Sequence, residues 1–168
     1  MEAKAKIFGH AIHPILIVFP LGLLGMSLIF DLIGKASDSG EWFLVSYYMI
    51  GAGILGGLLA AVFGLIDWLA IPRGTRASGV GLAHGLGMVG AVVFFAGSWF
   101  LRRDNPVLPE DLAIGLSVVG FLIAIVSGWL GGELVQKMGV SIVPGANLDA
   151  PLSLRKESPR LRPQQHGK

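Results

Sequence analysis

The sequence contains no cysteine and few charged residues, and both deficits narrow the class of protein. Without cysteine the chain can form no disulfide, no thiolate metal site and no covalent c-type haem attachment. Charged residues make up only 14% of the chain and hydrophobic residues 53%, whereas an ordinary soluble domain has roughly 25% charged residues. Together with a mean hydropathy of +0.69, this composition indicates a membrane protein.

Sequence signatures of catalysis are also missing. The chain has no HExxH, no GxSxG, no phosphate-binding loop and no nucleotide fingerprint. The basic charge is too small to argue for nucleic acid as a partner. A non-enzymatic protein is therefore favoured over an enzyme.

The apolar residues are gathered into four long stretches, separated by short polar segments. A helix needs about 20 residues to cross the roughly 30 Å hydrocarbon layer, and each stretch can supply them. The first stretch is longer than the apolar region of a signal peptide, so we expect it to remain as a helix. We predict an all-α, polytopic membrane protein, an up-down bundle of four transmembrane helices at about residues 12–33, 45–71, 80–101 and 112–134. Small residues four apart, such as Gly53 and Gly57 or Gly128 and Gly132, predict close helix packing, and no internal repeat is recognised.

The charges of the connecting segments predict the orientation. Ten basic residues lie on the side of both termini and three on the other. By the positive-inside rule, this multi-pass protein of the cell inner membrane has both termini in the cytoplasm. We expect one helical domain over residues 1–143, and a disordered, basic cytoplasmic tail over residues 144–168.

Ionisable side chains are expensive inside a membrane, so each one raises a functional question. Five lie within ~6–8 Å of the cytoplasmic boundary at 1.5 Å per helical residue: His10, His13, Asp67, His84 and Glu133. Asp31 lies at the outer end of the first helix, with Lys35 four residues later. That spacing favours an ion pair, so Asp31 and Lys35 are expected to be structural.

The stretch "GHAIHPILIVFP" opens the first span. His10 and His13 are three residues apart and would share one face of a helix. Pro14 suits a first helical turn; alternatively, both histidines sit in a turn just before the helix. Pro20 lies deeper, where it would kink the helix or leave a carbonyl free.

Three interpretations of this polar layer stay open. In the first, it binds a divalent metal or a haem b, because His13 (or His10) and His84 would face each other across the bundle diagonal. In the second, the histidines with Asp67 and Glu133 form a proton or ion relay. In the third, the groups only fix helix register and the protein is a structural membrane subunit without ligand.

Three segments of the chain resemble a known family. "GHAIHPILIVFPLGLLGMSLIFDL", "GLIDWLAIP" followed by "LAHG", and "GWLGGELVQKMGVSI" are similar to uncharacterised bacterial membrane proteins of domain-of-unknown-function family 2231. The resemblance covers about residues 8–143 and implies a four-helix inner-membrane domain. Some family members occur beside redox modules, which implies a redox-associated subunit with redox membrane proteins as partners. The apolar composition by itself gives the lipid bilayer as a partner, and the small residues four apart would serve a homodimer as well as packing within the chain. Carried over by position, the matching polar residues are His10, His13, Asp67 and His84.

Overall fold

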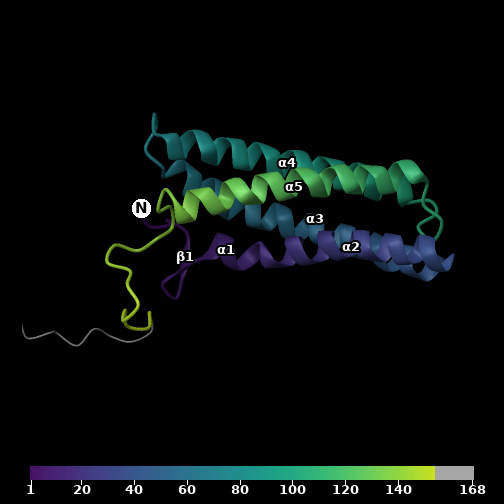
Figure 1. The fold of residues 1–168 in the computed structure, drawn as a ribbon, viewed down its shortest axis with the longest axis horizontal. Helices are drawn as coiled ribbons and strands as arrows, with labels where there is room; N and C mark the ends of the chain where they lie inside the picture. Colours follow the sequence, from purple (N-terminus) through teal and green to yellow (C-terminus); the bar gives the residue numbers. More distant parts are fainter. Residues whose placement is uncertain (154–168) are drawn as a thin grey trace, which may run out of the picture.

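The computed structural model describes residues 1–153 and is built from long helices that run antiparallel to one another (Figure 1). Their bounds are α1 Ile12–Leu16, α2 Val18–Ser37, α3 Gly40–Leu69, α4 Arg76–Arg102 and α5 Asp111–Gln136. A small antiparallel hairpin of β1 (Lys6–Ile7) and β2 (His10–Ala11) precedes them. Of the predicted tail, residues 154–168 lie outside the described residues.

Within residues 1–153, four helical segments are long and apolar enough to cross a membrane: α1 with α2, α3, α4 and α5. Large apolar side chains cover their outer surface, as in Leu21, Leu55, Leu86 and Val126, all of which are exposed. In water such a surface would be unfavourable, whereas hydrocarbon covers it at no cost. The predicted all-α polytopic fold is confirmed.

The first span is interrupted at Ile17, between α1 and α2. Pro20 has no backbone N–H, so the carbonyl of Leu16 loses the partner that a continuous helix would give it. Pro14 lies in the first turn of α1, where a missing N–H costs nothing. The free carbonyl predicted from Pro20 is therefore that of Leu16, while Ile17 keeps right-handed helical dihedral angles.

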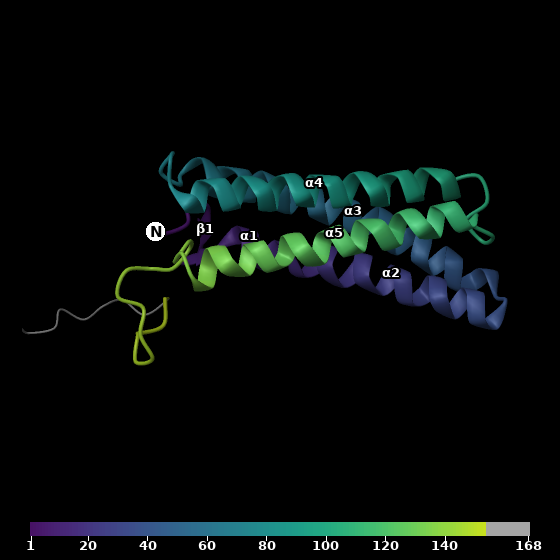
Figure 2. The same cartoon turned by 45° about the horizontal axis from the view of Figure 1, so that its top comes forward.

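Most helix packing occurs within two hairpins, α2–α3 and α4–α5. Asp38, with φ of 50°, ends α2 in the left-handed conformation and allows a very short connection to α3. The hairpins meet along α3 and α4 and, less extensively, along α2 and α5. Figure 2 shows the N-terminus and the end of α5 at one end of the bundle, here called the terminal end, with the α2–α3 and α4–α5 connections at the opposite end.

The two hairpins repeat one another, which corrects the expectation of no internal repeat. Equivalent positions are 71 residues apart in α1/α2 and α4: His13 with His84, Leu24 with Phe95, Ser27 with Ser98, and Asp31 with Arg102. The backbone of the second helix in each hairpin passes close to the same positions. An added Cβ would lie 2.6 Å from Leu24 at Gly53 and 3.0 Å from Phe95 at Gly120.

Glycines with the predicted spacing of four do not all mediate packing. Gly53 and Gly57 face neighbouring helices, whereas Gly128 and Gly132 have no atom within 4 Å of an added Cβ. The close approach of α2 to α3 therefore depends on Gly53, because lipid supplies little force to bring the helices together and contact at small residues must do so.

Candidate functional site

His13 enters the bundle from α1 and lies across α3. Its Nδ1 is 2.9 Å from the carbonyl oxygen of Ala60. The ring lies over Gly64, where an added Cβ would be 2.9 Å from the imidazole. A glycine is therefore required at residue 64 to admit the ring.

His84 makes the same contacts from α4 to α5. Its Nδ1 is 2.7 Å from the carbonyl oxygen of Ser127, and its ring lies over Gly131, where an added Cβ would be 3.0 Å away. In each hairpin the histidine thus bonds a carbonyl one helical turn before the glycine beneath its ring. The two hairpins therefore repeat both the sequence positions of their histidines and the contacts that these side chains make.

The two imidazoles meet inside the bundle. Their ring centres are 6.4 Å apart and their planes are nearly perpendicular, at 87°. Because a carbonyl oxygen only accepts, each Nδ1 must carry the proton in its hydrogen bond. A neutral imidazole bonded in this way keeps the lone pair of its Nε2 available, and both rings are only partly buried. The structure brings His13 and His84 together as predicted.

The structure does not bring the other predicted residues into this pair. His10 lies in β2, exposed, with its Nδ1 3.2 Å from the carbonyl oxygen of Phe8, so it shares no helical face with His13. Asp67 accepts hydrogen bonds from the backbone N–H groups of Lys4 at 2.7 Å and Ala5 at 3.1 Å. Its carboxylate therefore holds the N-terminal segment, residues 1–11 before α1, against the terminal end. Glu133 is partly buried near the end of α5, and its side chain forms no hydrogen bond within residues 1–153.

A second polar cluster, which the sequence did not reveal, lies at the opposite end. Arg102 and Asp31 form a bidentate ion pair with N–O distances of 2.6 and 2.8 Å, and their side chains are 0% and 1% exposed. The expected pairing of Asp31 with Lys35 is wrong, because Lys35 pairs with Asp111 instead. Arg102, four residues after Ser98, faces the bundle interior, whereas Arg103 faces outward.

Three serines complete this cluster, and all of them are buried. The Arg102 guanidinium donates to Ser98 Oγ at 3.1 Å, Ser46 Oγ at 3.3 Å and Ser117 Oγ at 3.4 Å. Ser117 in turn donates to Ser98 at 2.7 Å. All four membrane-spanning segments contribute a side chain, and across the described residues no buried side-chain nitrogen or oxygen lacks a partner. Such full satisfaction is what makes a buried charge tolerable.

An apolar layer separates the two polar clusters along the bundle. Leu24, Ile50 and Phe95 are buried and form one core cluster, flanked by Ile54, Trp99 and Phe121. Leu24 and Phe95 each lie eleven residues beyond their histidine and seven before their charged residue. Within the described chain, therefore, the histidine pair and the ion pair are not joined by a continuous polar path.

Comparison with known proteins identifies the family of the chain. A family model described as a predicted membrane protein, DUF2231, matches residues 9–144. The chain belongs to the DUF2231 family. The DUF2231 match includes all four spans and both polar clusters, but it begins after Met1–Phe8, which form most of the N-terminal segment. Searches of curated proteins and of solved structures found no match.

The kind of metal or cofactor that the DUF2231 domain could bind follows from the side chains that could coordinate it. Over residues 1–153 no group of three or more histidine, aspartate or glutamate side chains is placed to hold a metal ion. A zinc or copper site built from protein ligands usually has at least three. Two histidines can hold a metal whose remaining ligands come with a cofactor, as for haem iron.

Proposed function

We propose that the protein is an electron-transfer subunit of the membrane that holds a b-type haem between His13 and His84. The observation that carries the proposal is the histidine pair, with ring centres 6.4 Å apart and both Nδ1 atoms bonded to backbone carbonyls. Metal-ligating histidines commonly donate their other ring N–H in this way, which fixes the tautomer and orients the ring.

The two rings also lie close enough to share one ligand, with their centres 6.4 Å apart. The glycines at 64 and 131 hold the imidazoles close to the helix backbones. His13 and His84 would hold the haem, which would supply one-electron chemistry, with other redox membrane proteins as partners.

A proton relay across the membrane is the weaker candidate. The apolar layer of Leu24, Ile50 and Phe95 lies between the histidines and the buried ion pair. Asp67 accepts hydrogen bonds from backbone amides rather than from either histidine. A relay requires groups that pass a proton from one to the next. A purely structural role for the pair is one outcome of the following experiment.

The haem proposal is tested by absorption spectroscopy on the full chain, purified in detergent from cells supplied with a haem precursor. We expect a Soret band that shifts on reduction and that is lost in His13→Ala and in His84→Ala. His10→Ala is the matched control and should keep the band, because His10 is exposed and outside the pair. A colourless wild-type protein, or a band that survives in both pair variants, would overturn the proposal that His13 and His84 hold a haem.

We also propose the inner membrane as the location, with both termini in the cytoplasm. The support is the excess of basic residues on the side of the termini. Because the chain has no cysteine, single cysteines report topology without background. Lys137→Cys, at the terminal end, should resist a membrane-impermeant maleimide in intact cells, while Asp104→Cys should react. The reverse pattern would invert the topology.

A further inference from the structure

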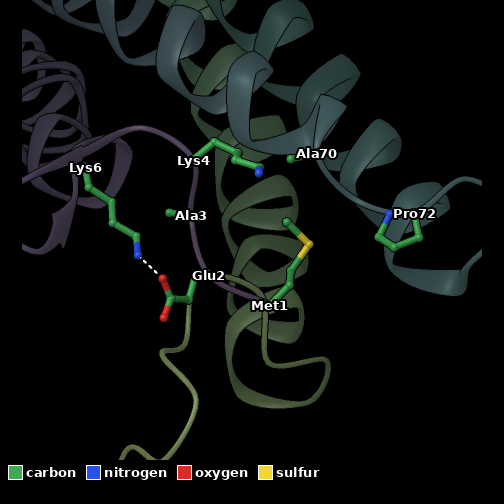
Figure 3. A pocket seen from close by; sticks show the side chains of 7 residues that line it. All are labelled: Met1, Glu2, Ala3, Lys4, Lys6, Ala70 and Pro72. Atoms are coloured by element: carbon green, nitrogen blue, oxygen red, sulfur yellow. Dashed lines mark hydrogen bonds and ion pairs between the residues drawn. The ribbon is translucent and has the colours of Figure 1, made fainter.

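A pocket of about 510 Å³ lies at the terminal end, between the N-terminal segment and the end of α3. Met1, Glu2, Ala3, Lys4 and Lys6 line it from the segment. The opposite wall consists of Ala70 and Pro72, which follow α3. Figure 3 shows the Lys4 side chain reaching toward Ala70, while Lys6 points to Glu2 on the other side of the segment.

The N-terminal segment is fixed in place at several points, so the pocket is preformed. Asp67 holds the backbone amides of Lys4 and Ala5, and the amino group of Met1 donates to the carbonyl oxygen of Gly139 at 2.8 Å. Ala3 is buried against the bundle. Binding of a ligand in the pocket would therefore not require the loss of conformational entropy that ordering this segment would cause.

The charge of the pocket is unbalanced in favour of an anion. Lys6 forms an ion pair with Glu2, whereas the Lys4 ammonium has no carboxylate within ion-pair distance in the described chain. Arg73 follows Pro72 directly and likewise forms no ion pair there. The Asp67 carboxylate accepts the amide hydrogen bonds and does not line the pocket. Lys4 is thus the group that an incoming anion would meet.

The depth of the pocket matches the headgroup layer of a bilayer. α3 ends at Leu69, and its 30 residues extend about 45 Å at 1.5 Å per residue, enough to cross the hydrocarbon and reach the headgroups. Ala70 and Pro72 lie just beyond that end. The walls also offer apolar surface from Met1, Ala3, Ala70 and Pro72, which suits the glycerol and first acyl carbons of a lipid.

We propose that this pocket binds the phosphate headgroup of an anionic phospholipid, with the Lys4 ammonium on the phosphate. The positive charge selects an anionic over a zwitterionic lipid. The apolar wall selects a lipid over free phosphate. The site lies outside the histidine pair, so it stands whether or not haem is bound.

The test measures thermal unfolding of the full chain in detergent as phosphatidylglycerol is added. We expect phosphatidylglycerol to raise Tm and phosphatidylcholine or inorganic phosphate to have little effect. In Lys4→Ala most of the phosphatidylglycerol shift should be lost. Lys137→Ala is the matched control: it removes the same charge from an exposed position at the same end, does not line the pocket, and should keep the shift.

Four outcomes would overturn the proposal: an undiminished shift in Lys4→Ala, an equal loss in Lys137→Ala, an equal shift with phosphatidylcholine, or a full shift with inorganic phosphate. If Lys4→Ala does not fold, native mass spectrometry of the wild-type protein decides. Retained phosphatidylglycerol that is displaced by salt supports the site, and retention of phosphatidylcholine to the same extent refutes it.

Discussion

Replacing Arg102 by leucine should lower the free energy of unfolding by about 3–5 kcal/mol, the cost of leaving one partner of a buried ion pair without the other. Arg102 is fully buried and donates to Asp31, Ser46, Ser98 and Ser117. Without the guanidinium, the Asp31 carboxylate would remain inside the bundle with no cation. Thermal or denaturant unfolding in detergent, followed by circular dichroism, measures the loss.

Arg103→Leu is the matched control for this experiment. Arg103 is the next residue, carries the same charge and pairs with Asp104 in an exposed position. Removing an exposed pair changes stability by less than about 1 kcal/mol. An equal loss in Arg103→Leu and Arg102→Leu would contradict the importance of the buried pair.

The double variant Asp31→Leu/Arg102→Leu should recover most of the stability that Arg102→Leu loses. Apolar residues of similar size often replace a buried ion pair at little cost. The serines left behind can donate to carbonyls of their own helices, as Ser27 already does to Leu24 at 2.7 Å. Strictly additive losses in the two single variants and the double variant would show that the two residues are not coupled.

Gly53→Ala should destabilise the protein by about 1–2 kcal/mol, because the new methyl group would be 2.6 Å from the Leu24 side chain and overpacking is costly. Gly128→Ala should leave stability unchanged or raise it by less than about 1 kcal/mol. No atom lies within 4 Å of that position, and alanine favours the helix. Unfolding in detergent compares the two variants, and a larger loss in Gly128→Ala would contradict the observed packing of α2 on α3.

The spans and the meeting of His13 with His84 were predictable because both follow from local rules. Apolar length gives a membrane helix, and alternate helices of an up-down bundle lie on its diagonal. Pro20 likewise acts through its own missing N–H. None of these inferences required knowledge of which residues lie opposite one another in neighbouring helices.

The role of Arg102 was not predictable by the same means. Arg102 lies beside Arg103 and Asp104 at the end of an apolar run, as a charged residue of a loop would. Only the rotation of α4 about its axis turns the Arg102 side chain toward the bundle interior. The available signal was the repeat, since Ser27 and Asp31 have the same spacing as Ser98 and Arg102. Asp67 was harder to interpret, because its partners are backbone amides, which any residue type supplies.

The contact between equivalent positions determines which hairpin each hairpin can pack against. His13 meets His84, and Asp31 meets Arg102, so equivalent positions of the two hairpins contact each other in both polar clusters. Two copies of the first hairpin arranged in this way would bury aspartate against aspartate, and two copies of the second would bury arginine against arginine. Only the mixed arrangement is electrically neutral at its centre. The ion pair therefore discriminates against self-association of either hairpin and selects the other half of the same chain.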